Sequence, residues 1–163
     1  MDTAYKTTLE LDKVLNRAVQ LCACQETKEM MQALEPAPTI EDERYDLTQT
    51  NAINALLIKN GSPRFGSVRE VRRIVAHARK GGILSMGELL EIAATLRNFS
   101  GLSQWYGLSE HEMLPTDDLF FALAPQPVLE KQISESIISP EEMADTASVT
   151  LHDLRRKIRQ TED

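Results

Sequence analysis

Apolar residues recur every three or four positions along most of the chain, which is the spacing of one face of an α-helix. The pattern predicts a first helix whose apolar face is formed by Leu11, Val14, Leu15, Ala18, Val19 and Cys22. A second, shorter helix is predicted over residues 26–34. It ends at the sequence EPAPT, because proline is disfavoured inside a helix and restricts the residue before it.

A third helix is predicted from Ile40 to Asn60. Thr39 precedes it as the N-cap, and the acidic residues 41–43 fall in its first turn, where the positive end of the helix dipole favours them. Gly61 directly follows Asn60, and a glycine in a left-handed conformation is a common way to end a helix. We therefore expect Gly61 to form the C-terminal stop.

The spacing of Ser67 and Glu70 predicts the start of a fourth helix, over about residues 68–80. In such a capping box the serine hydroxyl accepts a hydrogen bond from a backbone N–H, and the glutamate accepts one from the serine N–H. Both side chains are therefore assigned structural roles.

The next predicted feature is a corner at Gly81 and Gly82, where the fourth helix stops and the chain turns. Ser85 and Glu88 repeat the capping-box spacing and open a longer helix, from residue 86 to about residue 106.

The pattern is weaker after Gly107. The segments LFFAL and PVLEKQISESI predict two short helices separated by Pro125 and Pro127. Two alternatives stay open for the segment that begins at Ser139, namely a helix start and a type I turn with proline at its second position. The last predicted helix has a narrow apolar stripe, Leu151, Leu154 and Ile158, which is typical of the beginning of a long coiled-coil-like helix. We therefore expect the chain to be part of a longer protein.

Composition agrees with an all-α fold. The 163 residues are 42% hydrophobic but only 5% aromatic, and Leu, Ala, Met, Glu and Arg are plentiful. A chain of this length is expected to form one compact domain.

The net charge of −7 makes a general nucleic-acid coat or a membrane-surface binder improbable on electrostatic grounds. We find no apolar run of roughly 18–20 residues and no signal peptide at the N-terminus, so no membrane association is expected and the predicted location is the cytoplasm. Cys22 and Cys24 are two positions apart on a helix and point to different faces, so no metal site is predicted.

The sequence RKGGILSMGELL superficially resembles a nucleotide-binding loop. A P-loop requires GxxxxGK followed by Ser or Thr, so that backbone N–H groups, a lysine and a hydroxyl converge on one nucleotide. Here Lys80 precedes Gly81 and Gly82, and neither the P-loop pattern nor GxGxxG occurs in the chain. The helix corner is the better interpretation, and no arrangement of nucleophile and base predicts a catalytic residue.

Basic residues cluster in two places. Residues 64–80 carry a net charge of +5, and Arg69, Arg72 and Arg73 fall on the polar side of the predicted fourth helix. The second cluster includes Arg155, Arg156 and Lys157 in the last helix, followed by Arg159. Each cluster is either a solvated surface paired with acidic neighbours or a contact surface for phosphates or an acidic partner.

The run NGSPRFGSVREVRRIVAHARKGGILSMGELLEIAATLRNFSGL, residues 60–102, resembles the N-terminal region of the second-type MutS paralogue of bacteria, which carries a C-terminal Smr nuclease domain. TLELDKVL, EPAPT and ADTASVTLHDLRRKIRQ fit the same family in the same order, so the resemblance covers nearly the whole chain. One departure is SPEEM, which stands where the family usually has an acidic, glycine-containing turn.

The resemblance implies a non-catalytic helical core segment over residues 1–138, followed over 139–163 by a turn and the start of a lever helix. It implies that the ATPase site, with ATP and Mg, and the endonuclease site lie outside this chain. The family is further associated with homodimers, with branched or mismatched DNA in suppression of recombination, and with ribosomal RNA in rescue of collided ribosomes. The alternative from the residues alone is a free-standing helical adaptor whose basic helix 68–80 binds an acidic protein partner.

Overall fold

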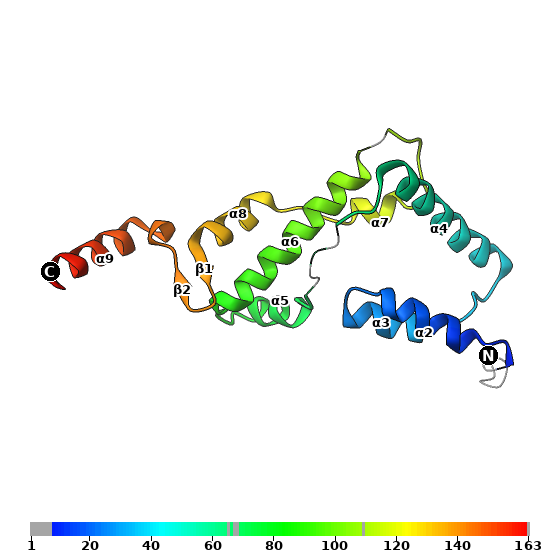
Figure 1. The fold of residues 1–163 in the computed structure, drawn as a ribbon, viewed down its shortest axis with the longest axis horizontal. Helices are drawn as coiled ribbons and strands as arrows, with labels where there is room; N and C mark the ends of the chain where they lie inside the picture. Colours follow the sequence, from blue (N-terminus) through cyan, green and yellow to red (C-terminus); the bar gives the residue numbers. More distant parts are fainter. Residues whose placement is uncertain (1–7, 65, 67–68, 109, 163) are drawn as a thin grey trace. The chain divides into compact units, whose positions relative to one another are not determined.

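The computed structural model describes residues 8–64, 66, 69–108 and 110–162. Its elements in chain order are the helices α2 (Leu11–Leu21), α3 (Gln25–Gln32), α4 (Ile40–Asn60), α5 (Arg72–Arg79), α6 (Met86–Tyr106), α7 (Asp117–Phe121) and α8 (Pro127–Ser136), the strands β1 (Ile137–Ser139) and β2 (Glu142–Met143), the 3₁₀ helix η1 (Asp145–Ala147), and α9 (Val149–Glu162) (Figure 1). The predicted all-α class is confirmed, with one short hairpin in addition.

The chain divides into two compact units rather than the single domain that its length suggests. Unit 1 consists of Met1–Val68 and Leu102–Leu123, and unit 2 of Arg69–Gly101 and Ala124–Asp163. Helix α6 contributes to both, since the boundary between Gly101 and Leu102 falls inside it. These units do not coincide with the division at residue 138 expected from the resemblance, which stays a prediction about the parent protein.

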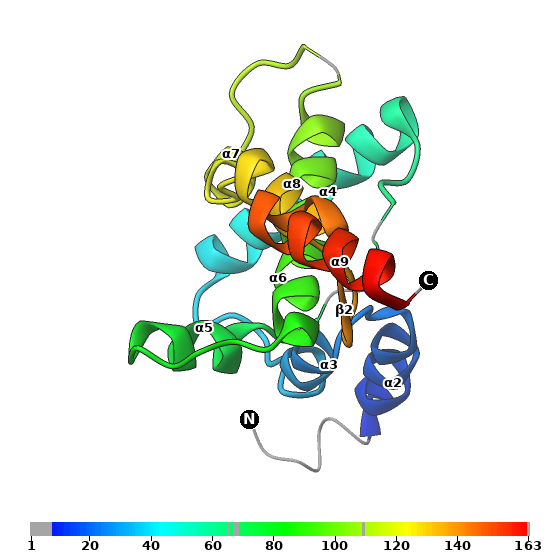
Figure 2. The ribbon, with the colours of Figure 1, turned by 90° about the vertical axis from the view of Figure 1, so that its left-hand side faces the viewer.

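Unit 1 begins with α2 and α3, which lie side by side as a helical hairpin (Figures 1 and 2). Its main apolar cluster is built further along the chain, around Leu56 of α4 and the aromatic pair Trp105 and Tyr106 at the end of α6. The Tyr106 ring stacks on Phe120 of α7 with the centroids 3.8 Å apart. Trp105 Nε1 donates a hydrogen bond of 2.8 Å to the carbonyl of Gly61, so the last turn of α6 is fastened to the end of α4.

Unit 2 has its own apolar cluster, around Ala93 of α6, Ile133 of α8 and Ile137 of β1. An ion pair adds to this packing, because the Arg97 guanidinium on α6 donates to the Glu130 carboxylate on α8 through Nε at 3.1 Å. The hydrogen bond from Arg97 holds the pKa of Glu130 below its usual value.

The hairpin resolves the alternative left open at Ser139. Strands β1 and β2 are antiparallel, with Ser139 opposite Glu142 and with Pro140 at the second position of the turn. The backbone N–H of Glu141 donates to the Ser139 hydroxyl, which stabilises the turn. A glycine is therefore not required at this turn, and SPEEM forms a hairpin all the same.

The start of the fourth helix differs from the prediction. Helix α5 begins at Arg72 with Val71 as its N-cap, which makes no side-chain capping bond. Ser67 lies outside the described residues, so its predicted bond with Glu70 stays a prediction. Glu70 precedes α5, so the predicted start of this helix at about residue 68 is wrong. Ile74 is the buried residue of α5, and an added turn containing the exposed Arg69 and Glu70 would bury little more apolar surface to offset its conformational entropy.

Candidate functional site

The corner at Gly81 and Gly82 is built by backbone hydrogen bonds. Gly81 has φ +82°, its N–H donates to the Ala78 carbonyl at 2.9 Å, and the Gly82 N–H donates to the His77 carbonyl at 3.1 Å. This pair of bonds is the Schellman motif that ends many helices. Gly61 also has a positive φ, +72°, and directly follows Asn60, the last residue of α4.

Ser85 and Glu88 form the reciprocal pair of a capping box. The Ser85 N–H donates to Glu88 Oε2 at 2.8 Å, and the Glu88 N–H donates to the Ser85 hydroxyl at 3.3 Å. The hydrogen bond from the Ser85 backbone, and to a smaller degree the one from its side chain, hold the pKa of Glu88 below its usual value. The charge of His77 lowers this pKa further. The serine therefore has a structural task at the start of α6.

This geometry does not fit a nucleotide with its magnesium ion. A phosphate loop presents backbone N–H groups to the ligand, whereas those of Gly81 and Gly82 are already bonded to helix carbonyls. The Ser85 hydroxyl, which would have to reach the metal, is bonded to Glu88. Among the described residues, no group of three or more His, Cys, Asp and Glu side chains is placed to hold a metal ion.

The first basic cluster does not form one continuous basic face. Arg69 lies before the helix, and Arg73 lines a cavity of about 500 Å³ together with His77, Glu70, Glu88 and Glu91. Three carboxylates thus line the same cavity as its one arginine. The arrangement favours the interpretation of residues 64–80 as a surface balanced by acidic neighbours.

The second basic cluster is organised around a carboxylate that the sequence did not single out. Asp145 of η1 accepts hydrogen bonds from Arg155 Nη1 at 2.5 Å and from Arg159 Nη2 at 2.7 Å, both on α9. Arg155 Nη1 also donates to the Met143 carbonyl at 2.9 Å. The hydrogen bonds from Arg155 and Arg159 hold the pKa of Asp145 below its usual value. We call the three residues Asp145, Arg155 and Arg159 the latch.

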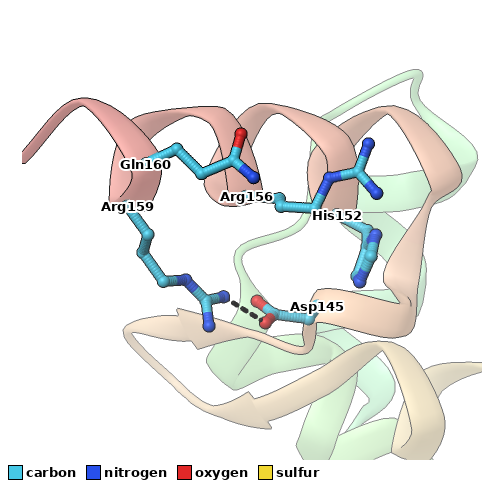
Figure 3. Close-up of a pocket in the computed structure, with 5 residues that line it drawn as sticks. All are labelled: Asp145, His152, Arg156, Arg159 and Gln160. Atoms are coloured by element: carbon cyan, nitrogen blue, oxygen red, sulfur yellow. Dashed lines mark hydrogen bonds and ion pairs between the residues drawn. The ribbon is translucent and has the colours of Figure 1, made fainter. Parts of the chain in front are cut away.

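The latch borders a concave site of about 190 Å³ on α9 (Figure 3). Its lining consists of Asp145, His152, Arg156, Arg159 and Gln160. Four of these residues come from one side of α9, and the dashed contact in Figure 3 joins Arg159 to Asp145. Of the predicted contact residues, Arg156 lines this site, Arg155 belongs to the latch, and Lys157 lies on the exposed surface of α9.

Sequence reasoning missed His152, Gln160 and Asp145 in this site. The spacing of His152 and Gln160 from Arg156, four residues in each direction, was a usable signal, because residues four apart share a helix face. Asp145 carried no such signal, since it lies outside α9 and contacts it only through the path that the chain takes in η1 before α9 begins.

The cysteines do not share a helix as predicted, since Cys22 follows the last residue of α2 and Cys24 precedes the first residue of α3. Cys22 Sγ lies 3.4 Å from the Ala18 carbonyl, Cys24 Sγ lies 3.0 Å from the Thr27 hydroxyl, and both thiols are free and half-buried.

Within the part of the chain that the structure describes, no helix has the length and apolar character to cross a membrane.

Sequence comparison identifies relatives that share the name Endonuclease MutS2. The protein from Ruminiclostridium cellulolyticum is 30% identical over 162 residues, which cover 98% of this chain and 20% of the relative. Those from Lachnospira eligens and Clostridium beijerinckii are 30% and 29% identical over 96% and 93% of this chain. No protein-family model and no solved structure matches the chain.

The chain thus spans about one fifth of the length of the curated relatives that it matches. The match runs through nearly all of the residues of this chain. It therefore includes both compact units and is not confined to one short motif. The predicted resemblance is confirmed.

Proposed function

Because this chain is homologous to part of the MutS2 proteins, we propose that it serves as the helical core and the start of the lever in a MutS-like, DNA-acting ATPase. Its task in that assembly is mechanical: it connects parts of the protein that contact nucleic acid with the part that hydrolyses ATP. Catalysis belongs to other segments of such a protein, which this chain does not contain.

The observation that carries the proposal is the shared helix α6. Its first turns pack around Ala93 in unit 2, and its last turn places Trp105 and Tyr106 in the cluster of unit 1. A single hydrogen-bonded helix of 21 residues therefore belongs to two separate apolar clusters. A helix of this kind carries a displacement from one cluster to the other without a loop to absorb it.

The arrangement of polar groups also supports a non-catalytic role. The glycine corner uses its N–H groups to end α5, and the acidic residues Glu88, Glu130 and Asp145 are engaged by a helix cap or by arginines. These groups have structural partners in place of a substrate. The same pairing weakens the adaptor alternative, since Arg73 of the basic helix lies among carboxylates and not on an open basic face.

Two cellular tasks follow for the whole protein under this proposal: suppression of homologous recombination through branched or mismatched DNA, and rescue of collided ribosomes through ribosomal RNA. The proposal includes a homodimer that uses ATP and Mg in its ATPase part, an endonuclease activity, and a cytoplasmic location. The relatives' shared name, Endonuclease MutS2, supports the assignment of nuclease activity to the whole protein.

The first test uses the purified 163-residue chain. We expect it to show neither ATP hydrolysis nor cleavage of branched DNA in the presence of Mg²⁺, with a full-length MutS2 protein as the positive control. Clear ATPase activity of the purified chain, retained through successive columns, would refute the assignment.

The second test uses the full-length protein and one exposed position of α6. A Cβ added at Gly101 would meet no heavy atom within 4 Å, so alanine fits there. Gly101→Pro removes a helix hydrogen bond and kinks α6, whereas Gly101→Ala strengthens it. We expect G101P to reduce the stimulation of ATP hydrolysis by branched DNA while G101A preserves it. Equal stimulation in both variants contradicts transmission through α6.

A further inference from the structure

The concave site beside the latch combines donors that suit a phosphate group. Arg156, Arg159, His152 and Gln160 supply guanidinium, imidazole and amide N–H groups from one side of α9. Arginine is the side chain best suited to a phosphate, because its planar donors match two oxygens at once. The carboxylate in this site, Asp145, already has two arginines bound to it.

The two arginines of the latch differ in how they are held. Arg155 is 33% exposed and donates both to Asp145 and to the Met143 carbonyl, so it fixes α9 to the hairpin. Arg159 is 66% exposed, and its guanidinium has five donors, of which the bond to Asp145 uses one. Arg156 is 61% exposed, and its contact with Asp153 is long, at 3.6 Å. Arg156 and Arg159 are therefore accessible to a ligand.

From this geometry we infer that the α9 face formed by His152, Arg156, Arg159 and Gln160 binds the phosphodiester backbone of nucleic acid, and that Asp145 competes with the phosphate for Arg159. The inference deepens the proposed function, on which it rests, by naming a contact surface. It selects nucleic acid over an acidic protein because the donors line one small concave site, and no apolar side chain lines it.

The competition has a physical cause. A carboxylate and a phosphate oxygen accept the same guanidinium N–H groups, and only one of them can occupy a given donor. In the free chain Asp145 takes the place of the phosphate and keeps Arg159 oriented over the site (Figure 3). When a phosphate takes Arg159, Arg155 still binds Asp145 and Met143, so α9 stays attached to the hairpin.

The test measures binding of the 163-residue chain to a fluorescent four-way DNA junction, to an RNA hairpin and to poly-glutamate over a series of salt concentrations. The variant Arg156→Gln leaves every latch bond in place. We expect R156Q to weaken junction binding about threefold to tenfold, and to reduce the slope of log affinity against log salt by about 1. Arg17→Gln, the same charge change on an exposed residue of α2, is the matched control and leaves affinity and slope nearly unchanged.

We expect Asp145→Asn to change junction affinity in the opposite direction to R156Q. Removing the competing carboxylate should tighten junction binding by about threefold, since the Arg159 donor that Asp145 holds becomes available to the phosphate. Circular dichroism of each variant checks that α9 is still folded. A purely structural latch would leave junction binding in D145N unchanged, weaken it, or tighten it no more than Asp12→Asn, the same charge change on an exposed residue of α2, and any of these results overturns the competition.

The remaining outcomes are decisive as well. The phosphodiester site is overturned if R156Q and the unsubstituted chain bind the junction with equal affinity. It is also overturned if the unsubstituted chain prefers poly-glutamate to both nucleic acids. Failure of the unsubstituted chain to bind either nucleic acid at low salt overturns it too. None of these results tests the mechanical role of α6, which is tested by the stimulation of ATP hydrolysis in the G101P and G101A proteins.

Discussion

The imidazole of His77 occupies the space where a side chain at Gly82 would begin. A Cβ built on Gly82 would overlap Nε2 and Cε1 of the His77 ring, well inside van der Waals contact. Two neighbouring glycines are thus required for different reasons, Gly81 by its φ of +82° and Gly82 by the ring above it. The distinction leads to a test at this corner.

Replacing Gly81 by alanine should lower the free energy of unfolding by about 1 kcal/mol, because an L side chain is strained at positive φ. Replacing Gly82 by alanine should also be destabilising, by roughly 1 kcal/mol, as His77 is forced to another rotamer. Urea unfolding followed by circular dichroism measures both values.

A second substitution separates the two causes. In a His77→Ala background, G82A should cost almost nothing while G81A keeps its full cost, since strain in φ does not depend on the ring. Gly101→Ala is the control for a helical glycine in open space and should stabilise the chain by about 0.5–1 kcal/mol. Equal losses for G82A with and without His77 would contradict the steric explanation.

The capping box at the start of α6 should be sensitive to a small deletion. Ser85→Ala removes the hydroxyl that accepts the Glu88 N–H and should cost about 1 kcal/mol. Ser85→Asp retains an acceptor and should restore most of that stability. Thermal unfolding of the two variants provides the comparison, and an S85A protein as stable as its parent would show that α6 does not depend on this cap.

Tyr106 links the aromatic cluster of unit 1 to buried polar groups. Its hydroxyl lies 2.8 Å from the fully buried Thr116 hydroxyl and donates to Asp117 Oδ1 at 2.7 Å. Tyr106→Phe keeps the stacking on Phe120 but deprives the Thr116 hydroxyl of this hydrogen bond, which should cost about 1–3 kcal/mol.

Trp105 is the single tryptophan and reports directly on the Tyr106→Phe change, because it packs in the same cluster. Denaturant unfolding followed by its fluorescence should show the loss. Thr116→Val in the Y106F background should recover part of it, since both members of the hydrogen bond are then apolar. No recovery in that double variant would argue against an unsatisfied hydroxyl as the cause.

The free energy of unfolding should fall in acid because Glu88 and Asp145 both have lowered pKa values in the folded chain. The pKa of Glu88 lies below its ordinary 4.5, through the bonds to Ser85, and that of Asp145 lies below its ordinary 3.8, through Arg155 and Arg159. A carboxyl with a lowered pKa in the folded state binds protons less readily than in the unfolded chain, so its contribution is present above the ordinary value and is lost as pH falls through the lowered one.

Asp145→Asn should therefore flatten the acid limb of a plot of melting temperature against pH, and Glu88→Gln should flatten it in the range just below pH 4.5. Each variant is compared with its parent in the same buffers at constant ionic strength. A D145N curve that runs parallel to the parent curve below pH 3.8 would contradict the part assigned to the latch.

Most helices were predictable from the sequence, because their signals are local. The Thr39 hydroxyl accepts a hydrogen bond from the Asp42 N–H, one turn along the helix. Ser85 and Glu88, which bond to each other, are three residues apart. Gly81 adopts its positive φ because glycine has no side chain. α6 accordingly spans the predicted range of residues 86–106. Such features depend on neighbours in the chain and are legible without a fold.

Other features depend on which distant groups meet in the folded chain, so they were not predictable from local patterns. The shorter α5 follows the burial of Ile74, not the local capping signal before it. Thr116 is fully buried, with its hydroxyl 2.8 Å from that of Tyr106. Asp145 meets Arg155 and Arg159 because of the path that the chain takes through η1 into α9. Burial and ion pairing between residues ten or more positions apart depend on where the backbone turns, which local periodicity does not encode.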